Sequence, residues 1–221
     1  MPRRRPAGAD MTRRELLRLI AAAPLLRCAT TEDMTARLSA RPRTAGHAKF
    51  LVMLHGAGGR GARVLENYRD FAKRFGVEMI APDSAGTTWD VIHTAFGADV
   101  ITINALLDAA FKRYDVDPRH LAIGGFSDGA SYALSLGLAN GDLFSHILAF
   151  SPGFAVPPSR HGSPRVFIAH GTEDTVLPVE NTRRLVARLR DARYEVRYDE
   201  FRGPHRTPEA VASAGLAWFT V

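Results

Sequence analysis

Ser127 lies in the segment Gly-Phe-Ser-Asp-Gly, a G-x-S-x-G pattern whose glycines are Gly125 and Gly129. An apolar run typical of a buried strand precedes the pattern, and a helical pattern follows it. A serine on so sharp a strand-to-helix turn takes a strained backbone conformation, and the two glycines let neighbouring segments approach without Cβ clashes. The turn presents the hydroxyl to solvent at a helix N-terminus, which favours a developing oxyanion. Ser127 is therefore a candidate nucleophile.

Two further residues follow in the chain order that such a nucleophile requires, an acid and then a histidine. Asp174 stands in a loop after the apolar run 166–169, and His205 stands in the loop before the last predicted helix. In such a set the imidazole takes the serine proton and later protonates the leaving group, while the carboxylate fixes the imidazole tautomer. Alone, Asp174 could cap a helix and His205 could be a surface residue. Their joint occurrence favours a catalytic triad.

The small-residue loop 55–59, His-Gly-Ala-Gly-Gly, follows the predicted strand 50–54. Such a loop can bring a backbone N–H close to a reacting carbonyl. We expect the N–H groups of Ala57 and Asp128 to form the oxyanion hole.

The same loop also supports a different interpretation. Gly56 to Gly61 reads as a literal G-x-G-x-x-G between a strand and a helix, and Asp83 ends the next predicted strand. This is the dinucleotide-binding fingerprint, so a nucleotide-binding α/β protein is an alternative. That interpretation does not account for the joint occurrence of Ser127, Asp174 and His205. A non-catalytic binding module on the same fold is a third possibility.

Three aromatic residues in the two longest loops are candidates to line a substrate pocket. Trp89 and Phe96 lie between residues 84 and 97, and Phe154 lies between residues 152 and 164. Loops after parallel strands converge at one sheet edge, so apolar side chains there could hold the hydrophobic part of an ester. Trp89 and Phe96 could equally pin their loop to the core.

The elements that must position these residues alternate between strand and helix. Short unbroken apolar runs indicate strands buried on both faces, so we predict a mostly parallel sheet with helices on both faces. The predicted strands are 50–54, 77–81, 120–124, 146–150, 165–169 and 195–201, and the predicted helices are 62–75, 98–114, 129–138, 179–193 and 208–219.

The motifs LHGAGG, GFSDGA, HGTEDTVLP and GPH together resemble the carboxylesterase/phospholipase family of serine α/β-hydrolases, close to acyl-protein thioesterases and dienelactone hydrolases. The resemblance covers nearly all of residues 49–221. It implies an α/β-hydrolase fold without a cap domain, a triad of Ser127, Asp174 and His205, and cleavage of carboxylic esters without a metal or organic cofactor. The family more often has glutamine or another neutral residue after the serine, where this chain has Asp128.

Composition and charge exclude several other classes. The chain has 221 residues, of which 46% are hydrophobic and 24% charged, which fits one globular domain. Its net charge of +6 is concentrated in the first 30 residues, which carry +5. The remainder is nearly neutral and lacks the excess positive charge that binding to a nucleic-acid backbone requires. Cys28 is the only cysteine and the histidines lack paired ligand spacing, so we expect no metal site.

We expect the N-terminal segment to be a targeting signal rather than part of the fold. Arg13 and Arg14 precede the apolar run 19–26, an arrangement that resembles a twin-arginine export signal. The run is far shorter than the roughly 20 residues of a spanning helix. We therefore expect residues 1–30 to be an export signal to the periplasm or exterior, residues 31–47 a linker and residues 48–221 the hydrolase domain. The alternative is a disordered leader or a surface helix with an arginine face, which would leave the protein in the cytoplasm. The expected partner is a small-molecule or lipid ester, and the oligomeric state is left open.

Overall fold

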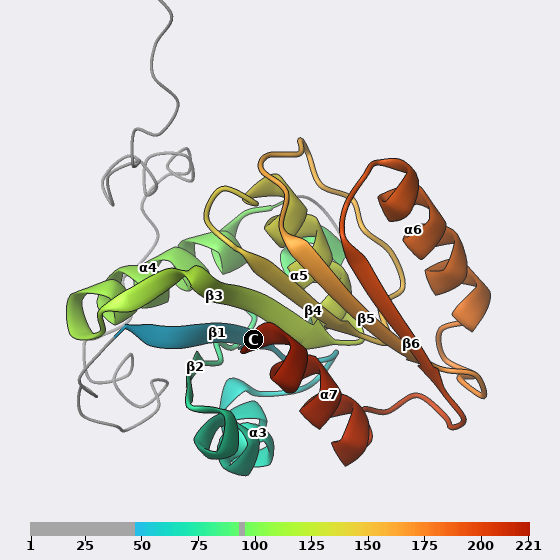
Figure 1. The fold of residues 1–221 in the computed structure, drawn as a ribbon, viewed down its shortest axis with the longest axis horizontal. Coiled ribbons are helices and arrows are strands. Elements are labelled where there is room, and N and C mark those ends of the chain that lie inside the picture. The colour runs from blue at the N-terminus through green and yellow to red at the C-terminus, as the bar shows by residue number, and fades with distance from the viewer. Residues whose placement is uncertain (1–46, 93–95) are drawn as a thin grey trace, which may run out of the picture.

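The structure, a computed structural model, describes residues 47–92 and 96–221 (Figure 1). Its strands are β1 (Ala48–Leu54), β2 (Val77–Ile80), β3 (Val116–Phe126), β4 (His146–Phe150), β5 (Arg165–Gly171) and β6 (Val196–Phe201). Its helices are α3 (Gly61–Phe75), the short 3-10 helix η1 (Asp90–Ile92), α4 (Ala98–Arg113), α5 (Asp128–Ala139), α6 (Val179–Asp191) and α7 (Glu209–Phe219). The expected export signal and linker, apart from His47, lie outside the described residues.

The six described strands form one sheet in the order β2-β1-β3-β4-β5-β6, and every neighbouring pair is parallel. Strand β1 shows why the apolar runs are unbroken. Phe50 and Val52 point to one hydrophobic cluster, whereas Leu51 and Met53 point to the other. Because successive side chains alternate between the faces, a strand covered on both sides must be apolar throughout. The predicted mostly parallel sheet is confirmed.

The helices cover both faces of this sheet, as predicted (Figure 1). Helices α4, α5 and α6 supply residues to one cluster, and α3 and α7 supply residues to the other. Helix α5 lies deepest: residues 129–138 are all buried. The residue that precedes it, Ser127, is therefore held in place at the edge of the sheet where strands β1, β3 and β5 end. Within the described residues, no helix is both long enough and apolar enough to cross a membrane.

Strand β3 is longer than predicted. It begins at Val116 rather than at residue 120, and its first part contains Pro118 and two charged residues. The register against β1 shifts between Ala48 and Phe50 at this point. Proline is tolerated at such an irregularity because the ladder is already interrupted there. The polar start of the strand hides it from a search for apolar runs.

His146 begins β4 and is buried between aromatic rings, with the ring of Trp218 at 5.2 Å and that of His120 at 6.3 Å. Burial, together with the nearby Arg165 guanidinium, lowers the pKa of His146 from 6.5 to about 4. Between these two pH values the unfolded chain therefore takes up a proton that the folded protein excludes, so the free energy of unfolding falls as the pH falls.

We expect this single histidine to account for a loss of about 3 kcal/mol between pH 6.5 and pH 4. Chemical denaturation across this range would measure it. In a His146→Gln protein the slope should become shallower, while His161→Gln, which changes an exposed histidine, should keep the original slope. Equal slopes in all three proteins would show that His146 titrates normally.

Candidate active site

Ser127 occupies the turn between β3 and α5 and is the residue that precedes the first turn of the helix. Its backbone has φ 56° and ψ −121°, a conformation that costs a non-glycine residue about 1–3 kcal/mol. The Ser127 N–H donates to the carbonyl of Phe150 on the adjacent strand β4, at 2.9 Å, which ties the turn to the sheet. The strained elbow expected from the sequence is present.

The two flanking glycines have the role expected of them. A Cβ on Gly125 would lie 2.3 Å from the carbonyl carbon of Gly129, and a Cβ on Gly129 would lie 2.4 Å from the carbonyl oxygen of His55. Both distances are far below contact distance, so no side chain fits at either position. The glycines thus let α5 approach strand β1 closely.

The structure brings Asp174 and His205 together with Ser127. His205 Nε2 lies 2.9 Å from Ser127 Oγ, and His205 Nδ1 lies 2.6 Å from Asp174 Oδ2. The acid comes from the loop after β5 and the histidine from the loop after β6, so three strand ends converge. Glu173, the neighbouring carboxylate, instead bonds Arg202 at the surface, at 2.8 Å.

Asp174 is wholly enclosed, and its side chain has no exposed surface. Its Oδ1 accepts hydrogen bonds from the N–H groups of Leu177 at 2.8 Å and Val176 at 2.9 Å. Burial alone would raise the pKa of Asp174, but these bonds and the one from His205 outweigh it and hold the pKa below its ordinary value. The carboxylate is therefore ionised and fixed in orientation.

A second histidine, His170, reaches the same carboxylate. Its Nε2 lies 2.8 Å from the carbonyl oxygen of Leu177 and 3.2 Å from Asp174 Oδ2, and its Nδ1 lies 2.9 Å from Thr182 Oγ1. Because a carbonyl only accepts, Nε2 carries a proton and directs it toward Leu177 and Asp174. In the sequence, His170 is recognisable only as a histidine that follows the predicted strand 165–169. Its contact with Asp174 depends on how the loop folds back.

The loop after β1 is held by His55, as its position at a strand end suggests. His55 Nε2 accepts from the N–H of Ser84 at 3.1 Å, so Nδ1 carries the proton and donates to the carbonyl of Gly56 at 2.8 Å. The carbonyl of His55 accepts from Trp89 Nε1 at 2.8 Å. These contacts fix the backbone on which Ala57 is carried.

The expected oxyanion donors are backbone N–H groups in the loop after β1 and at the start of α5. Among the described residues, the N–H groups of Ala57 and Asp128 have no hydrogen-bond acceptor. The Asp128 carboxylate accepts from the hydroxyl of Thr88 at 2.6 Å. The side chain is thus engaged by the loop before η1, while the N–H at the start of α5 stays available to a ligand.

The aromatic residues expected to line a pocket have different positions. Trp89 has no exposed surface and packs between the rings of His55 and Tyr132, so the prediction that it lines the pocket is wrong. It pins the loop to the core because its indole N–H finds a buried acceptor. Phe96 is half-buried, with its ring edge on Tyr132 at 5.3 Å, and Phe154 is half-buried. For these two, contact with substrate stays a prediction.

The glycine-rich loop also bears on the nucleotide alternative. Asp83, which that interpretation assigns to a ribose, accepts a hydrogen bond from the N–H of Gly61 at 2.6 Å. A Cβ on Gly61 would lie 1.9 Å from the carbonyl oxygen of Ala81. The glycine and the aspartate are therefore explained by the packing of α3 against the end of β2. Among the described residues, no cluster of three or more His, Cys, Asp or Glu could hold a metal ion.

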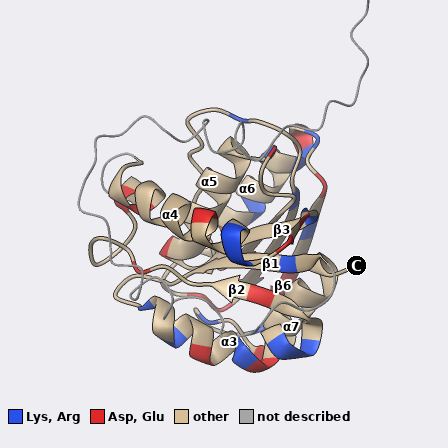
Figure 2. Ribbon diagram, turned by 90° about the vertical axis from the view of Figure 1, so that its left-hand side faces the viewer, with Lys and Arg blue, Asp and Glu red and all other residues tan. Residues whose placement is uncertain are grey.

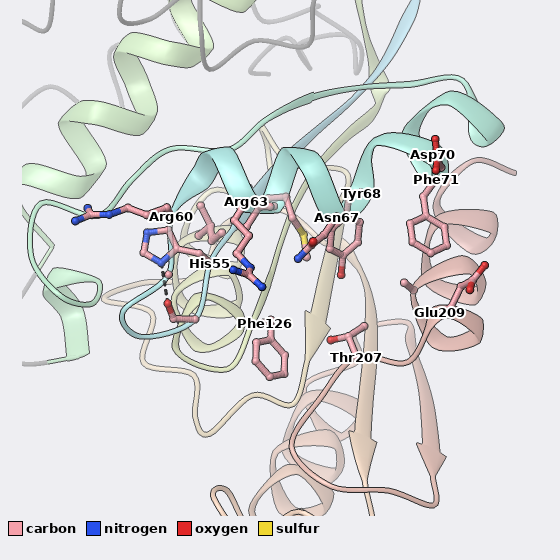
Figure 3. Close-up of a pocket in the computed structure, with 16 residues that line it drawn as sticks. His55, Arg60, Arg63, Asn67, Tyr68, Asp70, Phe71, Phe126, Thr207 and Glu209 are labelled. Carbon is pink, nitrogen blue, oxygen red and sulfur yellow. Dashed lines mark hydrogen bonds between the residues drawn. The ribbon is translucent and has the colours of Figure 1, made fainter.

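A cavity of about 590 Å³ lies beside the site, between α3 and α7 (Figure 3). It is lined by the loop residues His55 and Gly56, by Phe126 just before Ser127, and by side chains of both helices. None of the three aromatic candidates lines it. The sequence could not indicate this cavity because its two walls are far apart in the chain.

A parallel sheet covered on both faces, with a serine on a strained turn between a strand and a buried helix, is the architecture of α/β-hydrolases. The family model described as phospholipase/carboxylesterase matches residues 87–214, more than half of the chain. The chain belongs to this family of ester hydrolases, as the sequence motifs predict.

Solved structures share the fold. Esterase PE8 is 23% identical, with a TM-score of 0.67 over 82% of this chain and 97% of that one. The fluorophosphonate-binding serine hydrolase F of Staphylococcus aureus is 15% identical, with a TM-score of 0.66 over 80% and 86%. The carboxylesterase of Bacillus cereus is 18% identical, with a TM-score of 0.60 over 78% and 87%. A search of curated protein sequences finds no match.

Proposed function

We propose that this chain hydrolyses carboxylic esters through an acyl intermediate on Ser127. The observation that carries the proposal is the continuous hydrogen-bond chain from Ser127 Oγ through His205 to Asp174, on a strained turn held by β3 and α5. A serine hydroxyl is a weak nucleophile unless an adjacent base accepts its proton, and this chain supplies such a base.

In the proposed reaction His205 Nε2 takes the hydroxyl proton as Ser127 Oγ attacks the ester carbonyl. The imidazolium that forms is stabilised by Asp174, which holds the proton of Nδ1. The same Nε2 then gives its proton to the departing alkoxide, which leaves an acyl-serine. A water molecule, activated by His205 in the same way, releases the acid and restores Ser127.

The negative charge of the tetrahedral intermediate needs donors that are fixed before the reaction. We assign this role to the N–H groups of Ala57 and Asp128. The Asp128 carboxylate would oppose an oxyanion if it turned toward it, and its bond to Thr88 at 2.6 Å favours a different orientation. The N-terminal end of the α5 dipole adds to the same field.

Labelling of the wild-type protein with a fluorophosphonate tests the proposal. Intact-mass spectrometry should find one adduct per chain, because Ser127 lies on a strained turn beside a histidine that Asp174 orients, and phosphonylation mimics the acyl step. A p-nitrophenyl ester series from acetate to palmitate should then show turnover, and its optimum would separate a small-ester enzyme from a lipid-directed one. Absence of both adduct and turnover would favour the non-catalytic binding module.

His170 is assigned as a positioning residue that acts on Asp174. We expect His170→Gln to lower kcat by about tenfold with little change in KM, because Asp174 loses a donor that fixes its orientation. With one donor fewer, the carboxylate attracts the His205 imidazolium more strongly. The acid limb of the pH profile of kcat/KM should therefore move to higher pH.

The pH profile separates this role from a purely structural one. A merely destabilised protein would have a lower melting temperature with the original profile. A matched control is Thr182→Val, which removes the other partner of His170 and leaves its Nε2 contacts in place. An unshifted acid limb in a folded His170→Gln protein would contradict the assignment.

A further inference from the structure

The cavity between α3 and α7 adjoins the proposed nucleophile. A Cβ on Gly56, which lines the cavity, would lie 3.3 Å from Ser127 Cβ. Phe126 also lines it, and its ring lies 4.7 Å from the ring of His205. A group bound at this end of the cavity is therefore a near neighbour of an ester carbonyl held at Ser127.

Two arginines mark the end of the cavity next to the loop after β1. Arg60 precedes the first turn of α3 and Arg63 lies within it, and both line the cavity. Figure 3 shows the Arg63 guanidinium directed toward Phe126, whereas Arg60 points outward. Neither arginine forms an ion pair or side-chain hydrogen bond with any described residue.

Several other arginines of this protein pair with carboxylates. Arg183 bonds Glu200 at 2.7 Å and Arg165 bonds Glu195 at 2.7 Å. Arg63 is also placed in the positive end of the α3 dipole, where no acidic residue occupies the first turn. Asp83 accepts a hydrogen bond from the N–H of Gly61 in this turn, at 2.6 Å.

The opposite end of the cavity has the opposite charge. Asp70 and Glu209 line it and lie away from Arg60 and Arg63 (Figure 3). Tyr68 lies between the two ends, and Phe71 lines the cavity beside Asp70 (Figure 3). Figure 2 shows acidic and basic residues mixed along α3, so the separation of charge is a property of the cavity rather than of this helix as a whole. An anion is therefore favoured only at the end beside Ser127.

We infer that this cavity binds a carboxylate of the substrate, with Arg63 as its contact. This inference rests on the proposed function and gives its substrate class: short esters that carry a carboxylate within a few bonds of the reacting carbonyl. A guanidinium presents two parallel N–H donors that match a carboxylate, so the contact would orient the ester as well as bind it.

A matched pair of substrates tests the inference, 4-nitrophenyl hydrogen adipate and its neutral methyl ester. They have the same acyl chain and leaving group and differ by one charge. We expect the wild type to prefer the anionic ester and Arg63→Gln to lower kcat/KM for it by about tenfold, since a hydrogen bond to a charged group is lost. For the neutral ester, kcat/KM should change less than about twofold.

The control variant is Arg69→Gln, on the same helix but outside the cavity. It removes the same charge and should leave the ratio of the two kcat/KM values unchanged. A wild type without preference for the anionic ester, or an equal fall of the ratio in Arg63→Gln and Arg69→Gln, would overturn the inference.

Binding of free adipate keeps the inference testable if neither ester is turned over. Isothermal titration calorimetry should detect adipate with the wild type and a weakening of about tenfold with Arg63→Gln, whereas Arg69→Gln should bind as the wild type does. Loss of turnover on both esters with adipate binding intact would contradict the proposed function alone. Turnover of the neutral ester without adipate binding would contradict the carboxylate site alone.

Discussion

Replacement of Ser127 by alanine should lower kcat for ester hydrolysis by roughly four to six orders of magnitude and leave the fold intact. The hydroxyl supplies the atom that attacks, so no acyl intermediate can form without it. The residual rate would come from binding and from the N–H groups of Ala57 and Asp128, which the substitution leaves in place. Within the described residues, the Ser127 hydroxyl forms a hydrogen bond with His205 Nε2, and its loss costs little stability because the histidine is partly exposed.

Initial-rate kinetics on p-nitrophenyl butyrate and labelling with a fluorophosphonate would measure the loss. The single adduct expected for the wild type should disappear in Ser127→Ala. Retained turnover would mean that another residue is the nucleophile.

A second substitution at the same position separates backbone strain from chemistry. At φ 56° and ψ −121° a glycine is unstrained, whereas alanine keeps the strain of serine. Both variants should be inactive, but Ser127→Gly should melt at a higher temperature than Ser127→Ala. The opposite order would show that the turn is not strained.

The parallel sheet was predictable because its signals are local. Residues 146–150 are predicted as a strand and the structure has β4 at His146–Phe150, since a strand covered on both faces is apolar from end to end. The turn at Ser127 is encoded just as locally, by glycines two residues before and two after it. Chain order then indicated which acid and which histidine should lie beside it.

Features that depend on segments far apart in the chain were not predictable. Trp89 stands in a long loop, and nothing nearby in the sequence shows that its indole N–H finds the carbonyl of His55. The contact of His170 with Asp174 needs the loop after β5 to fold back on its own strand. The cavity forms because α3 and α7, the first and last helices in the described part of the chain, lie side by side (Figure 1).

The second large effect on kcat is expected at Asp174 rather than at the adjacent carboxylate, Glu173. Asp174→Asn should lower kcat by about four orders of magnitude, by analogy with triads elsewhere. Two backbone N–H groups bond Asp174 Oδ1, so the amide oxygen of asparagine would take that place and its NH₂ group would face His205. The imidazole would then accept at Nδ1 and carry its proton on Nε2, where it can no longer take the proton of Ser127.

Glu173→Gln is the matched control, because it makes the same change of charge one residue away. The Glu173 side chain is half exposed and pairs with the exposed Arg202, so an exposed ion pair is lost and the rate should stay within about twofold of the wild type. Steady-state kinetics on one ester would measure kcat for each variant, and a melting curve would measure the stability of each. If Glu173→Gln were the crippled enzyme and Asp174→Asn the active one, the acid would be Glu173, and the 2.6 Å contact between Asp174 and His205 would have no catalytic role.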